Sequence, residues 1–294
     1  MSIVPANVSK LLKEVEHLFS EASIPSPHLD AEVLLAYILD VNRAWLAAHS
    51  KEELGSEEVR KLESLVQRRL RREPIAYLTG TKEFYGRDFI VTPEVLIPRP
   101  ETEALIELSM KVLKYEVRSM KYGKITKLVD VGCGSGCIGI TLKLEHPELD
   151  VTLCDISPEA LAIAAENAKI LNADVTLVES DLLSSFFLLP SKIQNPKSKI
   201  HFDLIVANLP YVNRAWETSP ETAHEPALAL YANDNGLELI MKLIEQSTRV
   251  LAPNGLLALE ADPEQHERII EYAASLGFKH KVTDGYALIL ERKA

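Results

Sequence analysis

Two short segments of the chain hold residue types that suit the transfer of a group onto a nitrogen atom. One is the run Gly132-Cys133-Gly134-Ser135-Gly136, which follows an apolar stretch. The other is Asn208-Leu209-Pro210-Tyr211, which ends a second apolar stretch. Glycines let a backbone approach a bound ligand closely, and the second segment offers carbonyl oxygens beside an aromatic ring. We therefore expect a cofactor loop in the first segment and an acceptor site in the second.

The segment 208–211 fits the demands of a planar nitrogen acceptor. The lone pair of an amide or aromatic amine is delocalised, so an enzyme must hold both N–H groups and aim the nitrogen at the incoming carbon. The Asn208 side-chain oxygen can accept one hydrogen bond and the Leu209 carbonyl the other, with Pro210 extending the backbone and Tyr211 offering its ring face. Each bond contributes about 1–3 kcal/mol when desolvated. A plain strand-to-loop turn is the alternative, because Asn and Pro favour turns.

The glycine run alone leaves the cofactor open. Gly134, Gly136 and Gly139 also satisfy the dinucleotide pattern G-x-G-x-x-G, and Asp155 suits the ribose of a dinucleotide or of S-adenosylmethionine. Asp130 favours S-adenosylmethionine, because a carboxylate before the first glycine suits the cationic methionine end and would repel a pyrophosphate. A glycine turn without a ligand is the third possibility.

Asp181 and Leu182 follow a third apolar stretch. The Asp181 carboxylate can accept a hydrogen bond from an adenine amino group while Leu182 packs on the ring. An aspartate that caps a helix explains the same residues equally well.

The apolar stretches that precede these segments alternate with helical patterns, and this alternation predicts the fold in which the segments lie. Apolar strands that alternate with helices indicate a mostly parallel sheet covered on both faces. Asp284-Gly285 is a strong tight-turn signal, so the sheet should end in an antiparallel hairpin. This α/β pattern resembles the class I (Rossmann-like) methyltransferase fold. The predicted strands are 127–131, 151–155, 175–178, 204–208, 256–260, 280–284 and 286–291.

The chain divides into three predicted parts. Residues 1–73 carry apolar positions at helical spacing and should form a small helical bundle. Residues 74–100 hold β-formers, a glycine and several prolines, which predicts a β-hairpin linker. The third part, 101–294, contains both chemical segments.

Composition narrows the classes of function. The formal charge of −11 disfavours binding to nucleic acid, which depends on neutralising phosphates. The arginines at 68, 69, 71 and 72 are better explained as a solvated helix end than as an RNA contact. Three cysteines without a zinc spacing predict reduced residues and no metal site. We see no signal peptide or membrane span, and expect a cytoplasmic monomer.

The chain resembles the HemK/PrmC family, the release factor glutamine N5-methyltransferases. The resemblance covers nearly the whole length and rests on segments 72–80, 84–86, 95–103, 155–161 and 225–230, beside the glycine loop. It implies an enzyme that uses S-adenosylmethionine to methylate the glutamine of the Gly-Gly-Gln loop in class I peptide chain release factors. It implies that Asn208–Tyr211 receive the glutamine. We further hypothesise that the bundle 1–73 recognises the release factor, because the methyl site alone is too small to select a protein. The implied cofactor contacts are Gly132, Cys133, Gly134, Ser135, Gly136, Asp155, Leu182 and Asn208, to which the chemistry above adds Asp181.

Two departures from the family pattern stand out. Leu209 replaces the first proline of Asn-Pro-Pro-Tyr, which should weaken but not abolish activity. The family usually continues after the fifth strand with a glycine, whereas this chain reads Glu260-Ala261-Asp262-Pro263. The family also ends its last hairpin with an arginine-bearing loop, whereas Asp284-Gly285 makes a minimal turn here. We expect these last regions to lie away from the transferred methyl group.

Three other functions remain in competition. The same acceptor segment serves adenine N6 methylation of nucleic acid, although a flipped base needs a positively charged channel. A degenerate, non-catalytic binding protein would account for Leu209 and the short tail. A nicotinamide oxidoreductase would leave segment 208–211 without a role.

Overall fold

The computed structural model describes residues 3–119, 126–187 and 201–294. They fall into two compact units. The first comprises Met1–Thr81 together with Thr218–His224, and the second comprises Lys82–Glu217 together with Glu225–Ala294. The sequence did not indicate that the distant segment 218–224 belongs with the N-terminal helices.

The first unit is helical and has its own apolar core. Asn7 and Asn42 cap two of its helices, each accepting a hydrogen bond from a backbone N–H three residues later. Pro74 precedes a short helix that ends at Gly80, whose φ of 77° closes the last turn. This helix and α3 were not predicted, because elements of five or six residues are too short to show a helical period. The helices are α1 (Val8–Glu21), α2 (Pro27–Leu39), α3 (Arg43–Ala48), α4 (Ser56–Leu70), α5 (Ile75–Thr79) and the 3-10 turn η1 (Pro220–His224).

The arginine cluster at the end of α4 differs from the prediction at Arg69. Its side chain is buried, and its Nε donates to Asp30 Oδ2 at 2.8 Å while Nη1 donates to Glu221 Oε1 at 3.0 Å. Arg72 donates to the same Glu221 oxygen. Burial opposes ionisation of Glu221, but hydrogen bonds from Ser219 and Arg69 lower its pKa to about 2. The prediction of a solvated cluster is therefore wrong for Arg69, because a buried cation needs such partners.

The second unit begins with a β-hairpin and contains one seven-stranded sheet. The order of the large sheet is β5-β4-β3-β6-β7-β9-β8. Neighbours from β5 to β7 pair in parallel, whereas β9 pairs antiparallel with both β7 and β8. The strands are β1 (Thr81–Phe84), β2 (Arg87–Ile90), β3 (Lys127–Val131), β4 (Asp150–Asp155), β5 (Thr176–Glu179), β6 (Phe202–Ala207), β7 (Leu251–Glu260), β8 (Phe278–Asp284) and β9 (Ala287–Arg292).

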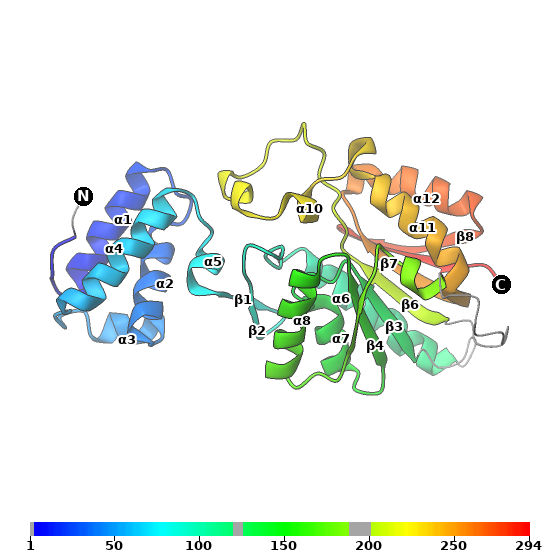
Figure 1. Ribbon diagram of the computed structural model, residues 1–294, viewed down its shortest axis with the longest axis horizontal. Helices are drawn as coiled ribbons and strands as arrows, with labels where there is room; N and C mark the ends of the chain where they lie inside the picture. Colours follow the sequence, from blue (N-terminus) through cyan, green and yellow to red (C-terminus); the bar gives the residue numbers. More distant parts are fainter. Residues whose placement is uncertain (1–2, 120–125, 188–200) are drawn as a thin grey trace. The chain divides into compact units, whose positions relative to one another are not determined.

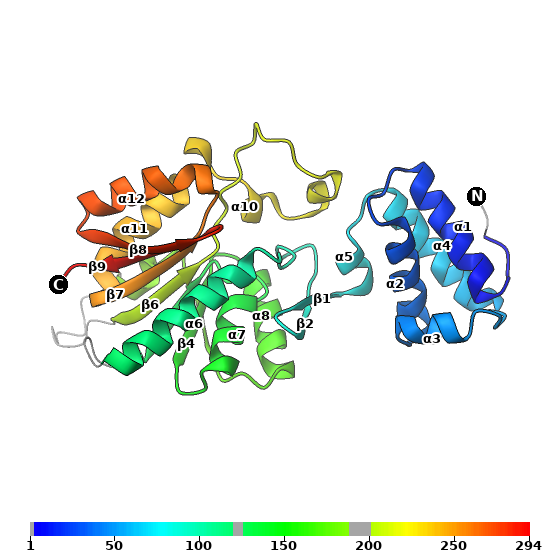
Figure 2. The same ribbon diagram turned by 180° about the vertical axis from the view of Figure 1, so that it is seen from behind.

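Helices cover both faces of the large sheet. Figures 1 and 2 show α6, α7 and α8 on one face and α11 and α12 on the other. Each face has its own buried apolar cluster. The remaining elements are α6 (Thr102–Ser119), α7 (Cys137–Glu145), α8 (Pro158–Ile170), α9 (Ser184–Phe187), α10 (Ala227–Leu230), α11 (Glu238–Val250), α12 (His266–Ser275), η2 (Asp234–Gly236) and η3 (Pro263–Gln265).

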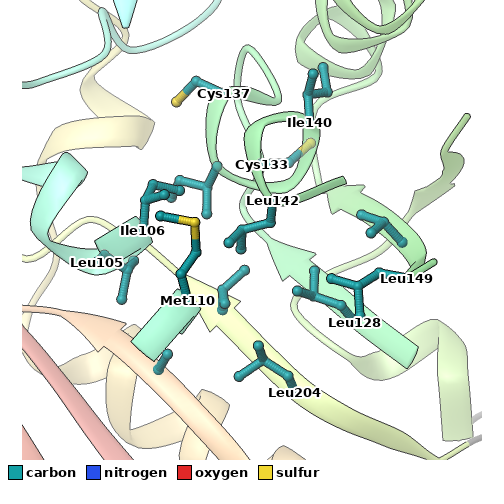
Figure 3. Close-up of a cluster of buried hydrophobic side chains, with 14 of the residues drawn as sticks. Leu105, Ile106, Met110, Leu128, Cys133, Cys137, Ile140, Leu142, Leu149 and Leu204 are labelled. Carbon is teal, nitrogen blue, oxygen red and sulfur yellow. The ribbon is translucent and has the colours of Figure 1, made fainter. Parts of the chain in front are cut away.

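The core beneath α6 and α7 supports the start of the glycine loop. Figure 3 shows Cys133, Ile140 and Leu142 near Leu128 of β3 and Met110 of α6. Leu128, Ile140 and Leu142 are fully buried. Tight packing of these apolar side chains restricts the position of the glycine loop relative to the sheet.

The predicted fold class is confirmed. All seven predicted strands of the sheet are present, with the antiparallel hairpin at its end. The hairpin β1–β2 turns through Tyr85 and Gly86, both with positive φ. In the described ranges no helix is long and apolar enough to cross a membrane.

Candidate active site

The strand register brings the ends of four parallel strands to one level. Val131 of β3 pairs with Cys154 of β4 and with Ala207 of β6, and Ala207 pairs with Leu259 of β7. The residues that follow these positions therefore stand in a row along the carboxyl edge: Asp155, Gly132, Asn208 and Glu260. The chain leaves β3 toward β4 and leaves β6 toward β7, so the crevice lies where the direction of winding reverses, as in other open α/β sheets.

A cavity of about 310 Å³ occupies this crevice. That volume lies at the lower end of the range of roughly 300–1,000 Å³ for small-molecule sites. Both predicted segments contribute to it. The predicted site residues that line it are Gly132, Cys133, Gly134, Ser135, Asp155, Asp181, Leu182, Asn208, Leu209 and Pro210.

Two predicted site residues lie behind this lining. Gly136 begins α7 with φ 79°, and its N–H donates to the Cys133 carbonyl at 2.8 Å, so it shapes the loop. Tyr211 is half-buried and its hydroxyl donates to Glu260 Oε1 at 3.1 Å. The structure thus gives both residues a supporting place next to the cavity.

Asp130 lies beneath the loop and is not among the residues that line the cavity. Its side chain is fully buried, and Oδ2 accepts from the Gly139 N–H at 2.8 Å. Burial raises the pKa of Asp130 to about 7, and the nearby charge of Asp155 adds to the rise. Asp130 was expected to face a cationic ligand, and here it holds the first turn of α7 to the end of β3.

Asp155 is fixed at the edge of the cavity by two backbone groups. Oδ2 accepts from Gly134 N at 2.9 Å and Oδ1 accepts from Ser157 N at 3.0 Å. A carboxylate oxygen has more than one lone pair, so each oxygen can still accept from a ligand hydroxyl. The bond to Gly134 also ties β4 to the glycine loop.

The two segments touch each other through Leu209 and Gly132. A Cβ atom built on Gly132 would lie 2.9 Å from Leu209 Cδ2, and Gly132 has φ 69°. Next to this contact, Asn208 Nδ2 donates to Thr102 Oγ1 at 3.0 Å. The contact uses one N–H of the Asn208 amide, and within the described ranges Oδ1 accepts no hydrogen bond.

Glu260 is a buried acidic residue that the sequence analysis did not include in the site. It is 1% exposed and accepts the hydroxyl hydrogen of Tyr211. Gln265, further along the same segment, donates from Nε2 to the Tyr211 carbonyl at 3.0 Å. Residues 260–263 were expected to lie away from the transferred methyl group; Glu260 is not among the residues that line the cavity, but it contacts the acceptor segment through Tyr211. An acidic residue that ends an apolar strand was a usable signal, because ligands bind at that edge.

Arg99 is a second residue that the analysis did not single out. Among the described residues that line the cavity, it is the one arginine or lysine. Its guanidinium pairs with Glu225, a nearly buried carboxylate whose Oε2 also accepts from Ile97 N at 3.2 Å. The Glu225 carboxylate thus keeps the positively charged Arg99 guanidinium beside the cavity.

Asn167 of α8 supports the glycine loop from the hairpin side. Its Nδ2 donates to the Ser135 carbonyl at 2.9 Å and to the Ile90 carbonyl at 3.0 Å, while Oδ1 accepts from Ile90 N at 2.7 Å. The side chain is 1% exposed. The β1–β2 hairpin, which was predicted as a linker, therefore also supports the glycine loop through Asn167.

The three cysteines are free and buried, and burial raises the pKa of each thiol. A raised thiol pKa disfavours the nucleophilic thiolate. Within the part of the chain that the structure describes, no group of three His, Cys, Asp or Glu residues is placed to hold a metal ion.

The sheet order, the glycine loop and the acceptor segment around one cavity define a class I methyltransferase. Two solved structures share this fold: a methyltransferase from Pyrococcus furiosus (18% identity, 78% of this chain and 99% of that one, TM-score 0.50) and a 16S rRNA N2 G1207 methyltransferase from Thermus thermophilus in complex with AdoMet and guanosine (15% identity, 73% and 50%, TM-score 0.51). At these identities they show the fold alone.

Sequence comparisons identify the family. Residues 10–80 match the PrmC N-terminal domain, and residues 117–226 match the methyltransferase small domain. The release factor glutamine methyltransferase of Koribacter versatilis is 41% identical over 85% of both chains. That of Deinococcus radiodurans is 34% identical over 92% of both. The chain belongs to the release factor glutamine methyltransferase family.

Proposed function

We propose that this enzyme transfers a methyl group from S-adenosylmethionine to the side-chain amide nitrogen, N5, of the glutamine in the Gly-Gly-Gln motif of class I peptide chain release factors. The observation that carries the proposal is that Asn208, Leu209 and Pro210 line the same cavity as the glycine loop. One small site can then hold a methyl donor and a carboxamide together.

The residues around the cavity fit S-adenosylmethionine. Asp155 offers carboxylate oxygens to ribose hydroxyls, and Leu182 and Ile156 supply apolar surface for a ring. Arg99 is the cation suited to the methionine carboxylate, because guanidinium and carboxylate form two parallel hydrogen bonds. When bound, this cofactor supplies an electrophilic methyl carbon on a sulfonium.

The chain's own residues orient the glutamine. We expect Asn208 Oδ1 to accept one amide hydrogen and the Leu209 carbonyl the other, which directs the nitrogen at the methyl carbon. Holding a near-attack geometry contributes more to the rate than either hydrogen bond. The attacking amide is neutral, so no base is needed before transfer, and the extra proton can pass to water afterwards.

Mass spectrometry of a class I release factor tests the reaction and the site together. After incubation with enzyme and S-adenosylmethionine, one peptide should gain the mass of a methylene group, located on the glutamine of Gly-Gly-Gln. Asn208→Ala should lose the modification. Asn233→Ala is the matched control, because Asn233 is exposed and its backbone carbonyl makes its hydrogen bonds.

Two results would contradict the proposal. An unmodified release factor, with S-adenosylmethionine bound to the enzyme, would indicate a non-catalytic binding protein. Methylation of DNA or RNA adenine instead would indicate the nucleic-acid enzyme, which the net charge of −11 disfavours.

We infer that the N-terminal helical unit recognises the release factor outside the Gly-Gly-Gln loop, since a site for one side chain is too small to select a protein. Removal of residues 1–73 should then raise KM for the whole release factor and leave KM for a short Gly-Gly-Gln peptide unchanged. An equal rise for both substrates would show that the deletion damages the site instead. We further propose that the enzyme acts on release factors as a cytoplasmic monomer and binds no nucleic acid.

A further inference from the structure

A buried carboxylate, Glu260, lies directly behind the acceptor segment. Glu260 ends β7, next to Asn208 at the end of β6, because their preceding residues Leu259 and Ala207 are paired. It is 1% exposed and forms no ion pair within the described residues. Burial of a carboxylate without an ion pair costs free energy unless hydrogen bonds satisfy it. The hydrogen-bond donors around Glu260 therefore decide how it is accommodated.

Among the described residues, three polar side chains of the site lie close to Glu260. The Tyr211 hydroxyl donates to Oε1 at 3.1 Å. The other oxygen, Oε2, is buried without a partner of full hydrogen-bonding geometry among the described residues, although Thr102 and Asn208 lie near enough to lower the pKa of this carboxyl. Burial acts in the opposite direction and raises it overall.

The hydrogen bond between Asn208 and Thr102 fixes which end of the Asn208 amide faces the cavity. Asn208 Nδ2 donates to Thr102 Oγ1 at 3.0 Å, so Thr102 accepts in this contact. The Thr102 hydroxyl hydrogen is then free to point at Glu260, a carboxylate that can only accept while ionised. The chain of donors runs in one direction, from the Asn208 amide through the Thr102 hydroxyl to Glu260.

We propose that Glu260 is a positioning residue for methyl transfer, which acts through Thr102 to keep the Asn208 oxygen turned toward the acceptor nitrogen and through Tyr211 to hold the end of the acceptor segment. The same carboxylate thus supports both ends of residues 208–211. This role rests on the proposed function, because it assumes that Asn208 Oδ1 accepts an N–H of the substrate amide.

The inference also gives a role to Thr102, which is the first residue of α6 and lines the cavity. A valine at 102 keeps the shape of threonine but cannot accept from Asn208. A serine keeps the hydroxyl. At position 260, glutamine keeps the size of glutamate but offers an NH₂ group where a carboxylate oxygen accepts, so the direction of the donor chain is no longer fixed.

The test compares Glu260→Gln, Thr102→Val and Thr102→Ser with a matched control, Glu291→Gln. Glu291 is another mostly buried glutamate of the same sheet, on β9, and pairs with Lys281 at 3.1 Å. Four quantities are measured for each: kcat and KM on a release factor, KM for S-adenosylmethionine, the melting temperature, and the ¹⁵N–¹H signals of the Asn208 side chain, assigned by their loss in Asn208→Ala.

We expect Glu260→Gln and Thr102→Val to lower kcat by about tenfold to a hundredfold, with KM for S-adenosylmethionine unchanged. Thr102→Ser should restore most of the rate, and Glu291→Gln should lower the melting temperature without lowering kcat. The Asn208 amide signals should shift, and exchange with solvent faster, in Glu260→Gln and Thr102→Val only.

Wild-type kcat in both variants, or Asn208 signals identical to those of the wild type, would overturn the positioning role. A loss of kcat that Thr102→Ser does not restore would overturn it too, since packing would then explain the effect. The proposed function fails separately, if the wild-type enzyme leaves every release factor unmodified. In that case the amide signals still decide whether Glu260 and Thr102 orient Asn208.

Discussion

The side chain of Leu209 lies against the backbone of Gly132, at the point where β3 and β6 both end. A Cβ atom on Gly132 would approach Leu209 Cδ2 to 2.9 Å. The contact follows from the register, because Val131 and Ala207 are partners in the sheet. The acceptor segment and the glycine loop therefore both line one cavity. A substitution in one of these segments should affect the packing of the other.

Alanine at position 132 should damage the loop more than alanine at 134. Both glycines have positive φ, which costs an alanine about 1–2 kcal/mol. At Gly134 a Cβ meets nothing within 4 Å, whereas at Gly132 it meets Leu209. Crowding should add roughly 1–3 kcal/mol at 132. Urea unfolding without cofactor measures both losses.

The double variant Gly132→Ala with Leu209→Ala is the control for this contact. Removing the leucine side chain should return most of the extra loss at 132 and none of the loss at 134. Equal losses at the two glycines would show that backbone strain alone matters there.

Proline at position 209 should raise kcat modestly. Pro210 already favours extended backbone at 209, and a second proline would restrict it further, by about 0.5–1 kcal/mol of conformational freedom, or roughly a two- to fivefold gain in kcat. The carbonyl that we expect to accept from the glutamine is kept. Leu209→Ala is the control, because it removes the side chain without restricting the backbone. A drop in kcat of tenfold or more in Leu209→Pro would contradict the role assigned to this carbonyl.

The sequence was sufficient to predict the strands, their parallel pairing and the antiparallel edge, because apolar stretches and turn residues are local signals. Once β3 and β6 are known to pair in parallel, the residues that follow them must share an edge. The sequence could not show that β7 lies beside β6 and so brings Glu260 next to Asn208, since strand order is set by packing between distant segments. Tyr211 illustrates the same limit, because its hydroxyl is held by Glu260, 49 residues away.

Arg69 shows why surface charge is hard to predict from local pattern. Four arginines within five positions at a helix end indicate a solvated face, and Arg71 is indeed exposed. The partner Glu221 is 152 residues from Arg69, in a segment that the sequence analysis did not connect with the helices. A long-range ion pair of this kind leaves no periodic signal.

Arg69→Met should destabilise the helical unit strongly. The change leaves the carboxylates of Asp30 and Glu221 without their shared buried cation, and loss of one partner from a buried pair costs about 3–5 kcal/mol. Arg71→Met, at an exposed position of the same cluster, should change stability little. Urea unfolding followed by circular dichroism measures both. Equal stability of the two variants would mean that the buried network contributes nothing beyond packing of the arginine stem.

Asp130 should make the stability of the protein depend on pH. Its pKa is about 7 in the folded protein and near 3.8 in the unfolded chain. Between these values the folded state binds a proton that the unfolded state does not. The contribution of protonated Asp130 to the free energy of unfolding is therefore complete below about pH 3.8. It falls as pH rises and is lost above about pH 7.

Asp130→Asn should remove this dependence, because an asparagine oxygen can still accept from Gly139 N and the side chain no longer ionises. The free energy of unfolding of the cofactor-free protein, measured in urea between pH 5 and 8, should decline more in the wild type than in the variant. Only the difference between the two curves is informative, since other groups titrate equally in both. That difference should flatten above about pH 7. Parallel curves over the whole range would show that Asp130 is ionised throughout, and that the loop tolerates a charge in its interior.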